Sequence, residues 1–336
     1  NNVAANIQVE HDRVRTQNVV GVIEGSDPGL KDEYIVIGAH YDHLGMGGWG
    51  SNSREPDTIA VHNGADDNAS GVAGVIEIAE QLASNRDELK RSVIAMAFGA
   101  EEMGLLGSKY FIDNPLVEKD KIVAMVNFDM IGRLNEEHVV MIGGSGTAAE
   151  SDSIIRKVGG DYDLDLRLSP EGYGPSDHAP FYASDIPVFF INTGVHQDYH
   201  TPVDDVEFIN FEGQKLVSEY SYSLVYALAT MDEPLTFQSA GSKQKGKRSM
   251  RFKVTLGIMP DFTATEVKGL GVGGVRKDGP AEKGGMMKGD VIVALDGKPV
   301  NDIYDYMNRL KKLEPGQTVP VDVMRDGERK VLLIQL

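Results

Sequence analysis

"SVIAMAFGAEEMGLLGS", residues 92–108, is an apolar run that ends at two adjacent glutamates, Glu101 and Glu102. The run is almost continuously apolar rather than alternating, which is typical of a strand covered on both faces. Carboxylates are costly beside a buried strand unless something pairs with them. Glycines on both sides of the glutamates make a tight turn plausible. The stretch therefore predicts a buried strand with a polar site at its carboxyl end.

Similar apolar runs recur through the first two-thirds of the chain. Residues 68–85 (NASGVAGVIEIAEQLASN) place apolar side chains at helical spacing, and residues 211–231 predict another helix. Strands alternating with helices predict an α/β fold, a three-layer sandwich around a mostly parallel central sheet. The predicted strands are 34–39 (YIVIGA), 92–100, 122–128 (IVAMVNF), 138–143 (HVVMIG) and 186–194 (IPVFFINTG).

From about residue 250 the pattern changes to short strands with turn signals. Asp326-Gly327 is a hairpin dipeptide. One helix is predicted over about 301–313, with Ile303, Met307 and Leu310 on one face. The predicted strands of this small β-rich domain are 252–259 (FKVTLGIM), 269–275 (GLGVGGV), 290–297 (DVIVALDG), 318–327 (TVPVDVMRDG) and 330–336 (KVLLIQL).

The segment between the two patterns, residues 233–249, is polar and ends in a basic cluster. This composition predicts a solvated linker. The chain is accordingly predicted to have a first domain at 1–232, a linker at 233–249 and a second domain at 250–336.

The composition is that of a globular protein with a core: 336 residues, 41% apolar and 25% charged. A net charge of −18 argues against a broad nucleic-acid-binding face. Cysteine is absent, so a metal site would use His, Asp and Glu. No apolar run has the length of a membrane span. Because the chain starts at Asn1, we expect a processed or excised piece, and an extracellular or periplasmic location.

Carboxylates and imidazoles follow the predicted strands at their carboxyl ends, where open α/β sheets place their sites. So many carboxylates at one sheet edge would repel one another without a multivalent cation. Imidazole and carboxylate without thiolate suit Zn²⁺, with Mn²⁺ or Co²⁺ also possible. The number of ligands favours two ions that share an aspartate and activate water for hydrolysis. The residues are His40 and Asp42, Asp66 and Asp67, Glu101 and Glu102, Asp129, and His200.

Six motifs in this region, in this order, closely resemble those of the M28 family of cocatalytic zinc aminopeptidases. They are AHYDHLG (39–45), HNGADDNASGVAGVIEIA (62–79), FGAEEMGLLGS (98–108), VNFDMIGR (126–133), GPSDHAPF (174–181) and DYHTPVDD (198–205). The resemblance covers about residues 20–230. It implies two zinc ions and a hydroxide between them that attacks the peptide bond.

The resemblance also implies a role for each residue that matches the family's motifs. His40 and Asp129 would hold one zinc, Glu102 and His200 would hold the other, and Asp67 would bridge them. Glu101 would be the general acid/base. Asp42 would orient the first histidine, and Tyr199 would hydrogen-bond the tetrahedral intermediate.

Several other residues in these motifs have no assigned role. Asp177 and His178 either line a substrate pocket or are a turn cap and a packed imidazole. His43 and His62 match no ligand position, so we expect them behind the ligands or at the surface. The insertion 44–61, with the only tryptophan, Trp49, is either a pocket rim or a surface loop. We expect structural or surface positions for the three remaining candidates, His11, His138 and His196.

The second domain resembles a PDZ domain of the bacterial protease type, through the run GPAEKGG at 279–285 and the residues that follow it. Thr255, Leu256, Gly257 and Ile258 match that family's carboxylate-binding loop. The resemblance implies that backbone N–H groups of Leu256, Gly257 and Ile258 receive a peptide C-terminus, with the peptide added as an extra strand. Alternatively, the domain packs on the first one with its groove blocked.

The function we expect from the sequence is a zinc metallopeptidase, an exopeptidase that hydrolyses the N-terminal peptide bond of peptides. A carboxypeptidase, a glutaminyl-cyclase-like member and a non-catalytic peptide-binding protein remain alternatives. M20-type enzymes are similar in site chemistry, but the resemblance implies a lid domain inserted before the final histidine. Too few residues lie between Asp129 and His200 in this chain for such a lid domain. The full set of ligands counts against the single-zinc cyclases and against a non-catalytic protein.

Overall fold

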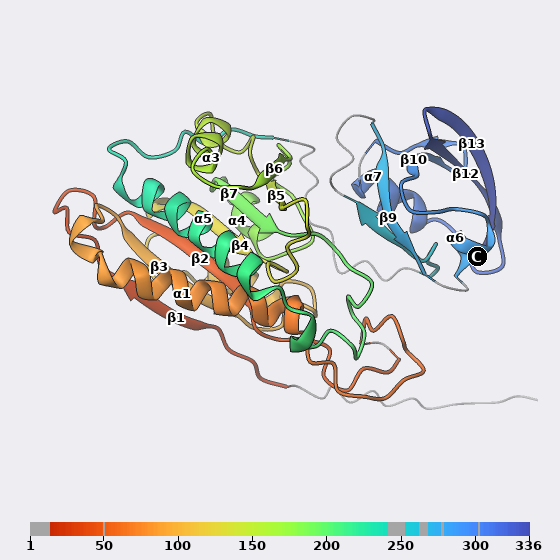
Figure 1. Ribbon diagram of the computed structural model, residues 1–336, viewed down its shortest axis with the longest axis horizontal. Coiled ribbons are helices and arrows are strands. Elements are labelled where there is room, and N and C mark those ends of the chain that lie inside the picture. Colours follow the sequence, from red (N-terminus) through yellow and green to blue (C-terminus); the bar gives the residue numbers. More distant parts are fainter. Residues whose placement is uncertain (1–13, 50, 241–252, 262–267, 277–278, 302) are drawn as a thin grey trace, which may run out of the picture.

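The computed structural model describes residues 14–49, 51–240, 253–261, 268–276, 279–301 and 303–336 (Figure 1). The first domain contains a seven-stranded sheet in the order β1-β3-β2-β4-β7-β5-β6. Neighbours among β3, β2, β4 and β7 are parallel, β1 and β5 pair antiparallel with the sheet, and β6 is parallel to β5. The strands are β1 (Val19–Ile23), β2 (Tyr34–His40), β3 (Ser92–Phe98), β4 (Ile122–Phe128), β5 (Val139–Gly143), β6 (Asp165–Leu168) and β7 (Val188–Asn192).

Helices cover both faces of this sheet, which explains why its strands are continuously apolar (Figure 1). Ile35 and Ile37 of β2 pack in one core with α1 and α5, whereas Val36 packs in the core on the opposite face with α2 and α4. The predicted three-layer α/β sandwich is confirmed. The helices are α1 (Gly71–Ser84), α2 (Leu106–Asp113), α3 (Ser151–Gly159), α4 (His178–Tyr182) and α5 (Phe211–Thr230).

The second domain has a six-stranded antiparallel sheet with a core of its own. Asp326 and Gly327 both have positive φ and join β12 to β13, as the hairpin dipeptide predicts. The elements are β8 (Ile258–Asp261), β9 (Leu270–Val275), α6 (Pro280–Lys283), β10 (Val291–Leu295), β11 (Lys298–Pro299), α7 (Ile303–Leu310), β12 (Thr318–Arg325) and β13 (Glu328–Gln335).

Two local predictions for this domain need comment. The strand predicted at 252–259 is wrong over 253–257, where the chain is a loop, and strand structure begins only at Ile258. The predicted apolar helix face holds for Leu310 and Met307, which pack in the core, while the Ile303 side chain lies outside the described part.

The first part of the predicted linker packs on the first domain. Phe237 pairs with Ala148 in a β-bridge, and the Tyr182 hydroxyl donates to the Ala240 carbonyl at 2.5 Å. Leu235 is buried in the first domain's core. Residues 233–240 therefore pack against the first domain, and the remainder of the predicted linker lies outside the described residues.

Among the described residues, no helix is both long and apolar enough to span a membrane.

Candidate metal centre

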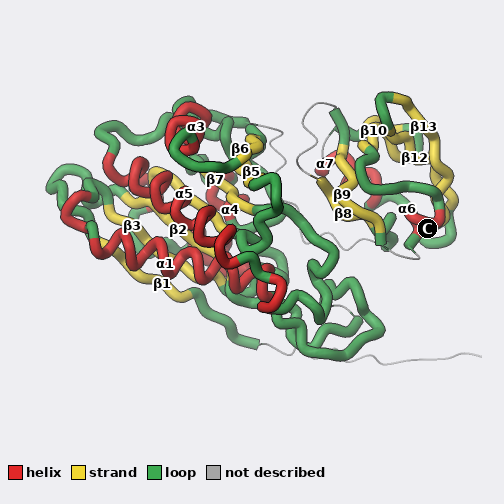
Figure 2. The backbone as a smooth tube through the Cα atoms, in the orientation of Figure 1, coloured by secondary structure: helices red, strands yellow, loops and turns green. Residues whose placement is uncertain are grey.

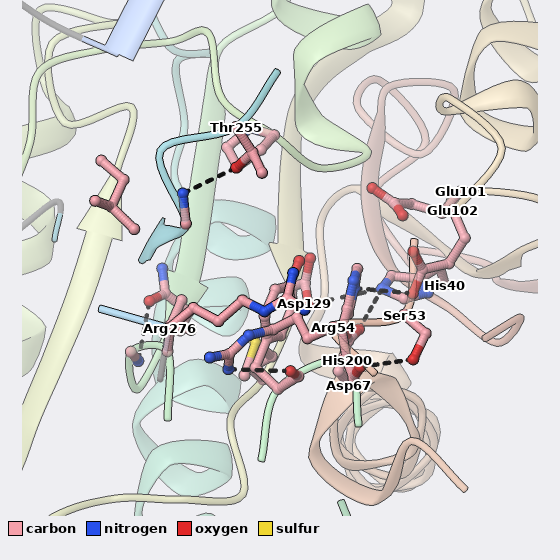
Figure 3. Close-up of a pocket in the computed structure, with 18 of the residues that line it drawn as sticks. His40, Ser53, Arg54, Asp67, Glu101, Glu102, Asp129, His200, Thr255 and Arg276 are labelled. Carbon is pink, nitrogen blue, oxygen red and sulfur yellow. Dashed lines mark hydrogen bonds and ion pairs between the residues drawn. The ribbon is translucent and has the colours of Figure 1, made fainter. Parts of the chain in front are cut away.

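Side chains from five separate segments meet at the carboxyl edge of the central strands (Figure 3). The loops that follow β2 and β7 lie together at this end of the first domain (Figure 2). The residues brought together are His40 at the end of β2, Asp67 in the short helical turn Ala65–Ser70, Glu102 after β3, Asp129 after β4 and His200 in the loop after β7.

Asp67 lies between the two histidines and offers one carboxylate oxygen to each. Its Oδ1 is 3.1 Å from His40 Nε2, and its Oδ2 is 3.1 Å from His200 Nε2. Asp129 Oδ1 lies 3.6 Å from His40 Nε2, and Glu102 Oε1 lies 3.3 Å from His200 Nε2. The donor atoms thus form two groups that share Asp67.

The spacing of these atoms fits zinc. Ligand atoms at 2.0–2.1 Å from a tetrahedral Zn²⁺ lie about 3.3 Å from one another. The four distances between donor atoms, 3.1–3.6 Å, bracket that value. Each group supplies one imidazole and carboxylate oxygens, which suits Zn²⁺ and similar divalent ions.

The orientation of both imidazoles fits metal binding as well. His40 Nδ1 donates to the backbone carbonyl of Asp42 at 3.0 Å, and His200 Nδ1 donates to that of Asn52 at 3.1 Å. A carbonyl can only accept, so Nδ1 carries the proton in both rings. In the neutral ring, Nε2 then presents its lone pair to the carboxylates, the arrangement that metal-binding histidines require.

The electrostatics of the cluster point to a positive charge between the carboxylates. Burial would lower the pKa of His200, but hydrogen bonds to Asp67 and Glu102 raise it to about 10. The pKa of His40 is also raised well above its usual value, because hydrogen bonds to Asp129 and Asp67 outweigh burial. A cation among these groups would displace both protons, so metal binding releases protons.

Glu101 and Glu102 occupy one turn but have different surroundings. Glu102 accepts from His43 Nδ1 at 3.0 Å, and hydrogen bonds to His200 and His43 lower its pKa against the effect of burial. Among the described residues, the Glu101 side chain has no hydrogen bond or ion pair, and it lines the cavity described below. Burial raises the pKa of Glu101 well above its usual value, and the charges of Asp177 and Asp129 add to the effect.

Asp42 makes a different contact from the one expected for a residue that orients His40. Its Oδ1 is 3.9 Å from His40 Nδ1, too far for a hydrogen bond, and the Asp42 backbone carbonyl takes that bond instead. The Asp42 carboxylate accepts hydrogen bonds from the backbone N–H groups of Glu101 at 2.9 Å and Glu102 at 3.2 Å. Asp42 therefore fixes the turn that presents both glutamates.

Asn68 ties the Asp67 turn to the end of β4. Its side-chain amide donates to the Phe128 carbonyl at 2.9 Å, and its oxygen accepts from Gly71 N and Met130 N. A Cβ at Gly71 would lie 2.3 Å from the Asn68 oxygen, so only glycine fits there. The local sequence DDNASG thus holds Asp67 beside Asp129.

Three residues at or next to the predicted ligands have strained backbone. Ala100 (φ 56°), Met130 (φ 60°) and His200 (φ 57°) are non-glycine residues with left-handed backbone. Ala100 directly precedes Glu101, and Met130 directly follows Asp129. His200 is itself a predicted metal ligand. Such strain persists where surrounding structure holds it, and it concentrates at functional sites.

The insertion 44–61 encloses His200 and is more than a surface loop. Ser53 and Arg54 line the cavity, and Arg54 N donates to the His200 carbonyl at 2.9 Å. Trp49 is 84% exposed, so the tryptophan is not part of the site. Tyr199 also lines the cavity and stacks on the His200 ring, with centroids 3.8 Å apart.

Asp177 and His178 lie behind the site and do not line the cavity, which favours a structural role for both. Both are fully buried: Ser108 Oγ donates to Asp177 at 2.5 Å, and His178 stacks on Phe190 with ring centroids 4.4 Å apart. Burial raises the pKa of Asp177 to about 7 and lowers that of His178 to about 3.

His43 lies behind the predicted ligands, one of the two positions expected for it, and its Nδ1 donates to Glu102 at 3.0 Å. One of the two groups of potential metal-binding atoms among the described residues joins His43, and not His200, to Asp67 and Glu102; the Nε2 of His43 is buried without a partner there. The place of His43 in the motif HYDH was the available signal. His62 lies behind it and contacts Ser53 Oγ at 2.8 Å.

The other histidines lie away from the predicted ligands or outside the described residues. His196 contacts Asp66 at 3.1 Å, His138 lies at the surface beside Asp163, and His11 falls outside the described residues. Asp66 directly precedes Asp67, the predicted bridging residue. Its carboxylate accepts a hydrogen bond from Gly132 N at 2.7 Å and so supports the turn that contains Asp67.

The cluster opens into a cavity of about 470 Å³ that both domains line. The first domain contributes His40, Asp67, Glu101, Glu102, Asp129 and His200, together with Arg54 and Tyr199. The second domain contributes Thr255, Gly257, Ile258, Arg276 and Met307 (Figure 3).

The predicted peptide-binding loop of the second domain therefore faces the metal-ligand cluster. Gly257 and Ile258 line the cavity, and Gly257 N donates a hydrogen bond to Thr255 Oγ1 at 3.0 Å. The Leu256 side chain is fully buried in the core of the second domain, so it is not part of the lining. Ile258 of β8 and Met307 of α7 also line the cavity.

Two family models match the chain. The model of peptidase family M28 matches residues 18–225, more than half of the chain. A PDZ domain model matches residues 241–336.

The chain is similar to several aminopeptidases. It is 30% identical over 254 residues to aminopeptidase YwaD of Bacillus subtilis, covering 71% of this chain and 50% of that protein. It is 28% identical over 326 residues to leupeptin-inactivating enzyme 1 of Streptomyces exfoliatus, covering 87% of this chain and 65% of that protein. Among solved structures, BSAP, a zinc aminopeptidase from Bacillus subtilis, matches with a TM-score of 0.51 and 27% identity over 62% of this chain and 49% of that one. The chain thus spans half to two-thirds of the length of these relatives.

Proposed function

Because the chain belongs to peptidase family M28, we propose that it is a zinc-dependent aminopeptidase that removes the N-terminal residue from peptides. The similarity to proteins named aminopeptidases supports this proposal. The observation that carries it is the position of Asp67, which offers one oxygen to each of two histidines at 3.1 Å. An aspartate in this position suits a pair of ions that share a ligand.

We assign the ligands in two groups. His40 and Asp129 would bind one Zn²⁺, Glu102 and His200 would bind the other, and Asp67 would offer a ligand oxygen to each. Bound there, the ions would acidify a water molecule and polarise the scissile carbonyl.

Glu101 moves the proton in this proposal. Its carboxylate takes a proton from the attacking water and passes it to the departing amine. Two features support the role: the side chain faces the cavity without a partner among the described residues, and burial raises its pKa above the usual range for glutamate, which favours uptake of a proton. Tyr199 stacks on His200 at the cavity wall, and its hydroxyl would donate a hydrogen bond to the developing oxyanion.

Hydrolysis of aminoacyl-anilides by the purified chain, with and without a chelator, tests the proposal. We expect chelation to abolish hydrolysis, zinc to restore it, and elemental analysis to find two ions per chain. A tripeptide and its N-acetyl derivative separate the exopeptidase types, because an aminopeptidase needs the free amine. Cleavage of the acetylated peptide would indicate a carboxypeptidase, and absence of any zinc-dependent hydrolysis would contradict the proposal.

Removing the Asp42 carboxylate tests how the glutamate turn is held. We expect Asp42→Ala to lower kcat/KM about 10- to 100-fold, as loss of a group that orients metal ligands does. Asp42→Asn keeps one acceptor oxygen and should lose less. Kinetics with metal analysis on both variants measure the effect. Equal rates for Asp42→Ala and the unchanged chain would show that the turn holds without its cap.

The predicted extracellular or periplasmic location stays a prediction, as do the domain limits 1–232 and 250–336. The same holds for peptide binding by the second domain, which its membership of the PDZ fold favours.

A further inference from the structure

Two arginines, one from each domain, lie next to each other in the cavity (Figure 3). Arg54 comes from the loop after β2, and Arg276 follows β9. Their charges act on each other: burial and the Arg276 charge both lower the pKa of Arg54. No carboxylate forms an ion pair with either guanidinium within the described ranges. Two like charges held together in this way favour an anionic ligand between them.

The position of Arg54 is fixed by the same loop that holds His200. Its Nη1 donates to the Gln197 carbonyl at 2.9 Å and to the Tyr199 carbonyl at 3.4 Å. These bonds use one end of the guanidinium and leave other N–H groups for a ligand. Arg276 is exposed, so its side chain can turn toward a ligand without breaking an ion pair among the described residues.

The cavity has opposite chemistry in its two parts. Near the metal-ligand cluster it is lined by carboxylates, which suit metal ions and a substrate amine. Near the second domain it is lined by the arginines and by apolar Ile258 and Met307. A volume of about 470 Å³ is in the range of small-molecule sites. It has room for a short peptide but not for a folded chain.

We propose that Arg54 and Arg276 bind the C-terminal carboxylate of a short peptide whose N-terminal residue lies at the metal-ligand cluster. The second domain would then complete the substrate site of the first, and the protein would select short peptides by their free C-terminus. The inference rests on the proposed aminopeptidase function. A long substrate would have no carboxylate at the arginines and would gain nothing from them.

Binding and turnover test the inference separately. Calorimetry on the Glu101→Gln variant measures binding without consuming the peptide, using trialanine and its C-terminal amide. We expect the acid to bind at least about tenfold more tightly, the size of effect for a charged hydrogen-bonded pair. Turnover by the unchanged chain is measured on alanine peptides from dialanine to octaalanine, each as the free acid and as the C-terminal amide. We expect kcat/KM of the acids to fall as the peptide lengthens, and the preference for acid over amide to disappear in the longest peptides.

Arg276→Gln is the informative variant, because Arg54 also supports the His200 loop. We expect the preference for acid over amide to fall to near one in Arg276→Gln. Arg329, an exposed arginine of β13 paired with Asp322, provides the matched control, and Arg329→Gln should keep the full preference.

Three results would overturn the inference: equal binding of acid and amide, an Arg276→Gln variant that keeps the preference, or rates that do not depend on length. If an amidated peptide with an internal glutamate binds as tightly as the acid, the arginines recognise an acidic side chain rather than a C-terminus. Because binding is read without turnover, a chain that bound acids selectively but hydrolysed nothing would contradict the aminopeptidase function and leave the arginine site intact.

Discussion

Glu101→Gln is expected to lower kcat by about 10²–10⁴-fold, the usual contribution of a general acid/base, while both metal ions stay bound. The substitution keeps the size of the side chain and removes the group that carries the proton. Metal should be retained because, among the described residues, the Glu101 side chain has no hydrogen bond or ion pair with the predicted ligands. Steady-state kinetics and elemental analysis on the same preparation measure both halves of the result.

Glu102→Gln is the matched control, since it makes the same chemical change one residue along the same turn. Glu102 contacts His43 and His200, so its variant should lose metal as well as activity. If Glu101→Gln lost metal, or kept the rate of the unchanged chain, the division of roles between the two glutamates would be wrong.

Asp67→Ala is expected to give the largest loss of metal of any single substitution. Asp67 is the one residue that we assign to both ions, so its removal weakens both sites. Loss of a group that only orients a ligand costs about 10- to 100-fold in metal affinity, and loss of a shared ligand should exceed this. Metal content after dialysis, and the rate on an aminoacyl-anilide, check the expectation.

Asp57→Ala is a suitable control, because Asp57 is an exposed aspartate in the loop 44–61. It should keep metal and activity. Circular dichroism on Asp67→Ala separates loss of metal from loss of fold. A folded Asp67→Ala chain that retained two ions would rule out the bridging role.

The central fold was predictable because its strands are buried on both faces and so stay apolar throughout. The predicted strands at 34–39, 92–100 and 122–128 match β2, β3 and β4 within two residues at each end. The edge strands were not predicted. β1 is largely exposed and β6 has four residues, so neither carries the apolar run of a central strand.

The convergence of the site residues was predictable, but several of their contacts were not. His40, Glu102, Asp129 and His200 each come after a predicted strand, and parallel strands bring such residues to one edge. Asp67 comes immediately before the predicted helix that connects the first two of these strands. A sequence does not give side-chain directions, so it could not place His43 against Glu102 or the Asp42 carboxylate on the glutamate turn. Arg54 and Arg276 were invisible for another reason, since only the approach of two domains brings them together.

The distribution of the metal ligands along the chain links ion supply to stability. Strands β2, β3, β4 and β7 and the turn before α1 must all be in place before the two groups of donor atoms exist. The unfolded chain therefore has no comparable site, and zinc bound as we propose would stabilise only the folded form, by about 2.7 kcal/mol when free ion exceeds the dissociation constant a hundredfold. Scarcity of zinc would then lower both the activity of the protein and its lifetime. The zinc-free protein would unfold more often and would be degraded more readily.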